Sequence, residues 1–232
     1  MKVKLITVGK LKEKYLKDGD KILDIGAGAG EYSLYFACKG YEVSALELAD
    51  ANIAAFKKKL TPEDKIDLVQ GNALDLSRYA DKSFDIVLLF GPLYHLKNDA
   101  DKQKCISEAK RVCKDGGKIF FAFISNDFVF LTEFGYDVNY FSNGDYDKET
   151  FKLNDFPFVF HTVGAARKLL ADGGINILHE VASDGASELL AARINEMSDE
   201  DYTQYLRYHF YICEKPELLG MTNHLLFMGE KK

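Results

Sequence analysis

The chain has 232 residues, 47% of them hydrophobic, and a formal net charge of −6, which suits one elaborated globular domain better than two independent ones. The apolar and aromatic content excludes global disorder, and the longest apolar runs fall far short of the roughly 20 residues of a membrane span. Four cysteines without a metal-like spacing indicate free thiols in the reducing cytoplasm. The acidic balance argues against broad contact with nucleic acid.

Charge separates a basic N-terminal segment from an acidic body. Residues 1–21 contain seven lysines and three acidic residues, so the rest of the chain carries the whole negative balance. A solvated helix face with outward lysines is favoured over a binding role. We therefore expect a basic segment over 1–20, followed by one domain over 21–232.

Strands and helices are predicted to alternate in the first half of this domain. Strands are expected at 22–25, 41–46, 65–69, 84–90 and 118–124, and helices at 31–39, 49–60 and 101–113. Short connections between such elements favour an α/β fold with a parallel sheet and helices on both faces. The uninterrupted apolar run over 86–90 is typical of a strand that is buried on both sides.

The alternation breaks in the second half. Residues 125–160 are rich in aromatic residues without a clean period, which indicates an inserted cap, although each aromatic residue taken singly also fits a core role. A second, smaller cap is expected at about 184–220. The remaining expected elements are helices at 161–170, 186–197 and 198–213 and strands at 175–181 and 224–228.

The strongest chemical signal is the glycine loop, residues 24–30, in which Asp24 is followed by Gly26, Gly28 and Gly30. Glycines after a strand let the backbone approach a ligand closely, and the next helix offers free N–H groups. The dinucleotide fingerprint Gly-x-Gly-x-x-Gly and the phosphate-loop Gly-Lys-Ser/Thr are both missing. Glu47 ends the second strand, where its carboxylate can accept both ribose hydroxyls. A neutral nucleoside therefore fits better than a dinucleotide.

Four segments resemble, in order and spacing, the motifs of class I S-adenosylmethionine-dependent methyltransferases: the glycine loop, Glu47, Gly71-Asn72-Ala73 and Phe84-Asp85-Ile86-Val87. The resemblance covers about residues 20–124, and the tail over 161–228 fits the family's last helix and antiparallel hairpin. It implies a Rossmann-like sheet of seven mostly parallel strands with an antiparallel last strand. It also implies a methyltransferase with S-adenosyl-L-methionine as its cofactor.

The same resemblance implies roles for individual residues. The glycine loop would cradle the methionine part of the cofactor, with Asp24 orienting the loop and Glu47 holding the ribose. Leu48 would pack against the adenine ring, and Asn72, with the backbone of Ala73, would address the adenine. Because Asn after Gly is also a common turn residue, a turn role for Asn72 is the alternative.

The segment Gly91-Pro92-Leu93-Tyr94-His95-Leu96 follows the fourth strand, at an edge where open parallel sheets bind ligands. It resembles a segment of a subset of small-molecule methyltransferases, which implies that Tyr94 and His95 face the methyl group and its acceptor. Alignment supplies much of the catalysis of a single displacement, and a base is needed only where the acceptor loses a proton. His95 suits that task, or it caps the next helix or bonds a backbone carbonyl.

These observations favour an enzyme that transfers a methyl group to a small-molecule acceptor by direct displacement. Residues 126–160 carry seven acidic residues against two lysines, and with their aromatic rings they favour an amine or a neutral apolar acceptor. The alternative, favoured for most of these carboxylates, is that they only solvate the outside of the cap. No histidine spacing indicates a metal site. The alternatives are a non-catalytic S-adenosylmethionine-binding protein, an RNA methyltransferase suggested by the basic N-terminus and, more remotely, a dehydrogenase. The oligomeric state is left open.

Residues 1–19 are similar to the start of the SPOUT-type methyltransferases that modify a pseudouridine in large-subunit ribosomal RNA. The similarity ends near Gly19 and nothing later resembles that family, so it implies no shared activity. We expect this segment either to add a strand over 3–8 or to form a helix over 10–17, with Tyr15 helping to cover the cofactor.

Overall fold

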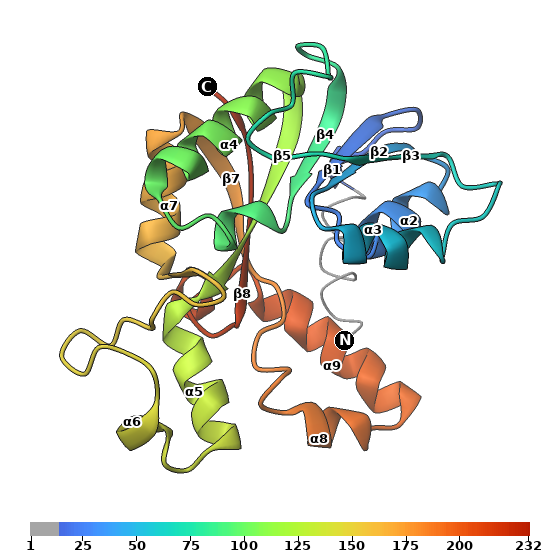
Figure 1. Cartoon of the computed structure of the whole chain (residues 1–232). Coiled ribbons are helices and arrows are strands. Elements are labelled where there is room, and N and C mark those ends of the chain that lie inside the picture. The colour runs from blue at the N-terminus through green and yellow to red at the C-terminus, as the bar shows by residue number, and fades with distance from the viewer. Residues whose placement is uncertain (1–13) are drawn as a thin grey trace.

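The computed structural model describes residues 14–232, and one sheet of eight strands runs through this part of the chain (Figure 1). The strand order is β3-β2-β1-β4-β5-β8-β7, and β6 pairs with β5 off this path. The strands are β1 (Lys21–Ile25), β2 (Glu42–Glu47), β3 (Ile66–Gln70), β4 (Phe84–Leu89), β5 (Cys113–Ser125), β6 (Phe160–His161), β7 (Ile175–Ala182) and β8 (His224–Lys231).

Seven of these strands confirm the predicted Rossmann-like, mostly parallel sheet. Only β8 runs antiparallel, and it pairs with both β5 and β7. The chain order reverses at β1, which lies between β2 and β4, and ligands of open sheets bind outside the strand ends at such a point. The two-residue strand β6 was not expected; it pairs with the end of β5 at Ile124 and Ser125.

Helices cover both faces of the sheet (Figure 1). On one face α4 and α7 pack against β1, β4, β5 and β8, and on the other α2 and the end of α9 pack against the same strands. Burial on both faces explains why the strands read as apolar runs. The helices are α2 (Glu31–Ala37), α3 (Asp50–Lys57), α4 (Asp99–Val112), α5 (Asn126–Tyr136), α6 (Tyr140–Asn143), α7 (Val163–Asp172), α8 (Ala191–Asn195) and α9 (Asp199–Ile212).

One helix is much shorter than the sequence pattern predicted. The helix expected over 186–197 is α8, which begins only at Ala191. The preceding backbone is held elsewhere, because the N–H groups of Asp184 and Gly185 both donate to the hydroxyl of Thr222. Residues 185–190 then form turns instead of a regular helix, with Ser187 N–H donating to Asp184 O and Ala191 N–H donating to Glu188 O.

Residues 126–160 and 183–223 lie beyond the end of the sheet at which β5 finishes (Figure 1). In the first segment, Phe130, Tyr146 and Leu153 form a small core of their own. The rings of Phe130 and Tyr146 are 4.7 Å apart, edge to face, and Tyr146 also stacks on Phe151. The aromatic residues of this segment therefore pack mainly on one another, as a local core does.

Only part of what was predicted for the N-terminal segment can be compared with the structure. The strand expected over 3–8 lies outside the described residues, and of the helix expected over 10–17 only Lys14 and Tyr15 are helical in the described part. The Tyr15 hydroxyl lies 2.7 Å from His179 Nε2 on β7, in a hollow it shares with the start of β5, opposite the glycine loop. Tyr15 therefore does not cover that loop, contrary to expectation.

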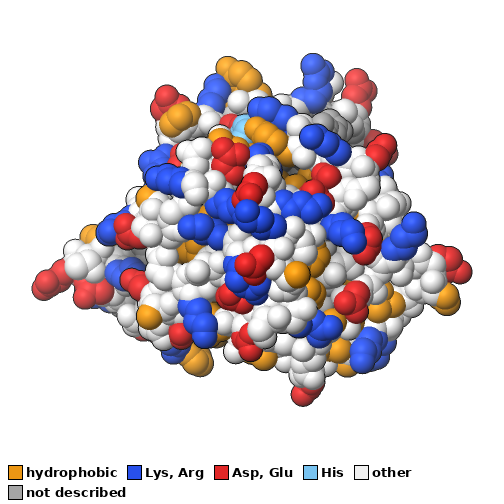
Figure 2. Space-filling model, turned by 90° about the horizontal axis from the view of Figure 1, so that it is seen from above, with side chains coloured by type: hydrophobic (Ala, Val, Ile, Leu, Met, Phe, Trp, Pro, Cys, Tyr) orange, Lys and Arg blue, Asp and Glu red, His pale blue; other side chains and the backbone are white. Residues whose placement is uncertain are grey.

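Basic side chains gather at the end of the sheet where β4 and β5 begin, interleaved with acidic ones (Figure 2). Lys82 and Lys231 both contact Asp115, and Lys114 contacts Asp85 at 2.7 Å. Exposed pairs of this kind add little stability, but they neutralise one another's charge. The lysines of this end are thus part of a mixed surface.

We expect Phe227→Ala to lower the free energy of unfolding by about 3–5 kcal/mol, measured by urea denaturation, because it leaves a cavity in the core. Phe227 on β8 is 1% exposed and packs edge to face on Phe123 at 5.6 Å. Phe156→Ala is the control: Phe156 is 77% exposed, and its loss should cost less than about 1 kcal/mol. Equal losses for the two variants would contradict this packing.

Candidate functional site

The glycine loop joins β1 to α2 and is held against β2. Backbone N–H groups of Gly26 and Ala27 both donate to the carbonyl of Leu46, at 2.8 and 3.0 Å. At Gly26 the φ angle is 73°, and a Cβ would lie 2.7 Å from the Pro92 ring, so only glycine permits this close approach. At Gly28 a Cβ would meet no atom within 4 Å. The loop is closed toward the protein at Gly26 and open toward a ligand at Gly28.

The carboxylate of Glu47 lies at the end of β2 and faces this loop. One of its oxygens accepts from Gly28 N at 2.8 Å, and the other accepts from Ala49 N at 2.8 Å and from Asn52 Nδ2 at 3.3 Å. Glu47 is only 6% exposed, so these bonds fix its orientation. Because a carboxylate offers about four acceptor sites and three are used, it retains capacity for one hydroxyl of a ribose.

Asp24 is a buried carboxyl at the base of the loop. It is 1% exposed, and the Ser33 hydroxyl donates to it at 2.7 Å. Burial raises the pKa of Asp24 to about 6; the Ser33 hydrogen bond opposes the rise, and the charge of Glu47 adds to it. A cation bound nearby would favour the charged form. The site therefore holds negative charge that a positively charged ligand can compensate.

The two expected adenine contacts differ in their surroundings. Leu48 follows Glu47 and is 62% exposed, so it presents an apolar side chain beside the site. The side-chain carbonyl of Asn72 accepts from Leu74 N at 2.9 Å, which is an Asx turn. The turn role of Asn72 is thus present in the structure. Ala73 packs at the margin of the main core, and adenine contacts of all three residues stay predictions.

A pocket of about 170 Å³ opens beside the loop, and we call it the Tyr94 pocket. Tyr32 of α2 and Phe90 after β4 form one wall, with ring centroids 4.6 Å apart. Burial raises the pKa of Tyr94, with the charges of Asp24 and Glu47 adding to the rise, so Tyr94 keeps its proton at neutral pH. The lining residues are Tyr32, Phe90, Tyr94, Ala122, Ser183, His224, Leu225 and Leu226.

His95 lies beside Tyr94 but outside the lining of this pocket. It is exposed, and its ring packs against Tyr94 at 5.0 Å and Phe158 at 5.2 Å. The expectation that His95 caps the next helix is wrong, because Asn98 caps α4 by accepting from Asp101 N. Its role as a base stays a prediction.

Sequence reasoning missed the imidazole that does line the pocket. His224 begins β8, and its Nδ1 lies 2.6 Å from the carboxylate of Asp184, which follows β7. These residues are forty positions apart and meet because β7 and β8 are paired. No local spacing in the sequence could have signalled this contact.

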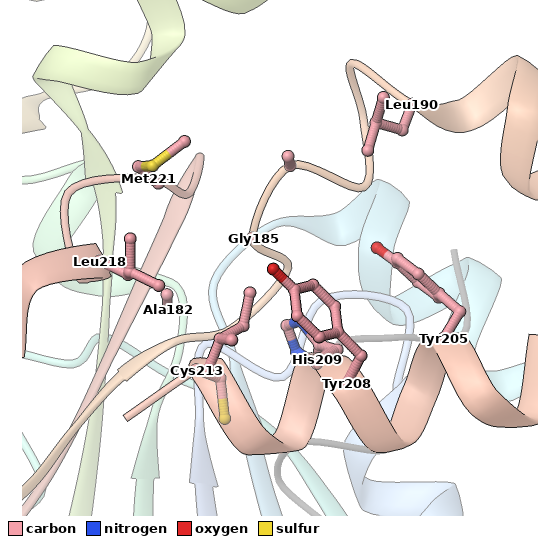
Figure 3. Close-up of a pocket in the computed structure, with 11 residues that line it drawn as sticks. Ala182, Gly185, Leu190, Tyr205, Tyr208, His209, Cys213, Leu218 and Met221 are labelled. Carbon is pink, nitrogen blue, oxygen red and sulfur yellow. The ribbon is translucent and has the colours of Figure 1, made fainter. Parts of the chain in front are cut away.

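A second, mostly apolar pocket of about 200 Å³ lies on the α9 side of the segment 182–186 (Figure 3). Tyr205, Tyr208 and His209 project from α9 toward Gly185, and Met221 closes the other side. Within the described residues, no group of three His, Cys, Asp or Glu side chains is arranged to hold a metal ion, and no helix is long and apolar enough to cross a membrane.

Comparisons with known proteins find similarity in the central part of the chain. Residues 23–121 match a family model described as a methyltransferase domain. A demethylmenaquinone methyltransferase of Clavibacter sepedonicus is 34% identical over 121 residues, 52% of this chain and 47% of that protein. A ubiquinone/menaquinone biosynthesis C-methyltransferase of Haemophilus ducreyi is 33% identical over 111 residues, 45% of this chain and 41% of that protein. The matched segment thus spans less than half of each relative.

Among solved structures, an S-adenosylmethionine-dependent methyltransferase of Methanosarcina mazei shares the fold, with a TM-score of 0.61, 20% identity and coverage of 95% of this chain and 96% of the other. The chain therefore has the Rossmann-like fold of this S-adenosylmethionine-dependent methyltransferase, and its residues 23–121 are similar to a methyltransferase domain. The similarity of residues 1–19 to SPOUT-type methyltransferases is not supported. The family match begins only at residue 23, and SPOUT enzymes have a different fold.

The buried charge of Asp24 has a measurable consequence for stability. Its pKa is higher in the folded chain than the ordinary 3.8, so its contribution to stability is present below pH 4 and is lost as the pH rises through about 6. Asp24→Asn keeps an acceptor for Ser33 and should raise the free energy of unfolding at pH 8 by about 3 kcal/mol, with little effect at pH 4.

Asp85→Asn is the matched control in the same denaturation experiment. Burial opposes ionisation of Asp85, but hydrogen bonds from Lys114 and from the backbone N–H of Lys21 outweigh it and lower its pKa. This variant should lose stability at pH 8. If Asp24→Asn instead lowers the free energy of unfolding at pH 8, the ionised Asp24 carboxylate does not destabilise the folded chain.

Proposed function

We propose that the protein is a methyltransferase that moves the methyl group of S-adenosylmethionine to a small-molecule acceptor by direct displacement. One observation carries the proposal: the glycine loop, the Glu47 carboxylate and the Tyr94 pocket converge where the strand order reverses. The named activities of the two curated relatives, both quinone-pathway methyltransferases, support an acceptor of low molecular mass.

The residues at this point fit the cofactor. The open face of the loop at Gly28 can take the methionine part, Glu47 can accept a ribose hydroxyl, and Leu48 can cover the adenine. Bound there, S-adenosylmethionine would supply a methyl group on a positively charged sulfur. The carboxylates of Asp24 and Glu47 stabilise that positive charge, and Tyr94 positions the acceptor beside it.

We infer that the acceptor is a neutral apolar molecule or an amine. The Tyr94 pocket is lined by aromatic, aliphatic, Ser and His side chains, and none of its lining residues is Lys or Arg, so it has little to hold a phosphate. The aromatic residues of 126–160 support this inference less than expected, because they pack on one another.

The alternatives are less well supported. A non-catalytic cofactor-binding protein would have its acceptor space filled, whereas here an aromatic-lined hollow lies beside Tyr94. An RNA methyltransferase would need a basic face, and the described lysines at the start of β5 are paired with carboxylates (Figure 2). We place the reaction in the cytoplasm, in keeping with four free cysteines.

Calorimetric titration with S-adenosylhomocysteine and S-adenosylmethionine tests the cofactor site. Both should bind, and Glu47→Gln should weaken binding at least tenfold, because an amide nitrogen would face the N–H of Ala49 or Gly28 and a negative charge would be lost. Glu42→Gln, at the exposed start of the same strand, should leave the affinity unchanged. Absence of binding by folded protein would refute the proposal.

A panel of methyl acceptors tests the substrate class. With radiolabelled cofactor, we expect label in phenols, hydroquinones or amines, and none in mononucleotides or RNA. Turnover confined to phosphorylated acceptors would contradict the lining of the Tyr94 pocket. His95→Asn in the same assay shows whether His95 removes a proton, because a base should be worth at least a hundredfold in rate.

A further inference from the structure

We propose that His224 is the general base of this methyl transfer, that Asp184 positions it, and that the acceptor atom is therefore a hydroxyl oxygen. The inference rests on the proposed function and deepens it. It concerns a pair of residues that no sequence motif indicates, formed where the chain leaves β7 and enters β8.

The carboxylate of Asp184 is buried and held in one orientation. It is 1% exposed, and one oxygen accepts from the His224 backbone N–H at 3.1 Å and from the Thr222 hydroxyl. Its other oxygen lies 2.6 Å from His224 Nδ1. The backbone N–H of His224 and the Thr222 hydroxyl both donate to the carboxyl group, and hydrogen bonds of this kind favour its charged form.

This arrangement sets the tautomer of the imidazole. An ionised carboxylate can only accept, so Nδ1 of His224 carries the hydrogen and Nε2 of the neutral ring carries the lone pair. The side chain keeps 29% of its surface exposed and lines the Tyr94 pocket. In residues 14–232 no hydrogen bond to Nε2 is formed, so this nitrogen is available to a molecule in the pocket.

The environment of the ring suits a base. The other titratable groups that line the pocket are Tyr32 on α2 and Tyr94 after β4, and burial raises the pKa of both, so they remain neutral donors at physiological pH. His95 is less suited to this role, because it is exposed, lies outside the lining of the pocket and packs against two aromatic rings. His224 is thus the imidazole with both a carboxylate partner and access to the pocket.

The proton balance points to the class of acceptor. A neutral amine attacks with its own lone pair, whereas a phenol or alcohol must lose its proton as the new bond forms. The acceptor oxygen bonds to the methyl carbon, sulfur keeps the electron pair of the broken carbon–sulfur bond, and Nε2 of His224 takes the hydroxyl proton. Asp184 stabilises the resulting imidazolium, which then releases the proton to solvent.

Two variants separate this role from a purely structural one. In His224→Asn the side-chain amide nitrogen can replace Nδ1 as the donor to Asp184, so the link between β7 and β8 is kept while the base is removed. Asp184→Asn keeps the volume and removes the charge that fixes the tautomer. His179→Asn is the matched control, because His179 on β7 also pairs with a carboxylate, Glu214 at 2.7 Å, away from the pocket.

Nitrogen-15 NMR of the histidine rings reads the tautomer without turnover. In the ligand-free protein at pH 8, we expect His224 to show a protonated Nδ1 and an unprotonated Nε2, and the Nε2 resonance should shift when S-adenosylhomocysteine or catechol is added. Asp184→Asn should mix the two tautomers. A His224 ring that carries hydrogen on Nε2, or that stays an imidazolium at pH 8, overturns the proposal.

Turnover gives the second readout, with the hydroxyl acceptors of the panel as probes. His224→Asn should lower kcat at least a hundredfold with unchanged affinity for S-adenosylhomocysteine, and His179→Asn should match the native rate. Transfer to amines alone, or a loss below tenfold in His224→Asn, overturns the assignment. Failure of S-adenosylhomocysteine to bind would refute the proposed function instead, and the NMR result would remain a separate test of the pair.

Discussion

The hydrogen bonds between the glycine loop and the end of β2 are the interaction on which the site depends. Leu46 O receives two N–H groups of the loop, and Glu47 receives a third from Gly28. They hold the turn after β1 where Gly26 touches Pro92 in the segment after β4. Three chain segments far apart in sequence are thus fixed at one corner of the sheet.

At that corner, a group that lowers the stability of the folded chain also favours binding of a positively charged ligand. Asp24 is buried where its ionised form is disfavoured, and Glu47 adds a second negative charge nearby. Natural cores avoid such groups unless they are paired. The opposing charge here would come from the ligand, so the same carboxyl that weakens the folded chain strengthens its hold on a cation.

The features that could be predicted from the sequence are those that depend on residues close together in the chain. Alternating apolar runs and glycine stops gave the strands and helices from β1 to β5, and the motif spacing located the glycine loop and Glu47. The sequence could not predict β6, or the pairing of His224 with Asp184, because each depends on segments brought together only by the folded sheet. Asn72 and the aromatic residues of 126–160 have side chains that could serve either a ligand or the local structure, and the sequence does not distinguish these roles. In the structure Asn72 forms a turn and the aromatic residues form a local core.

The segment between β7 and β8 has its two ends bonded to each other, and this has an evolutionary consequence. Asp184 and Thr222 are bonded to each other, so residues 185–221 leave and return at almost the same point. The entropic cost of closing a loop rises only with the logarithm of its length, so a longer loop between these two residues costs little more stability. The segment between them can therefore lengthen or be remodelled in evolution without moving Asp184 or His224, which lines the Tyr94 pocket.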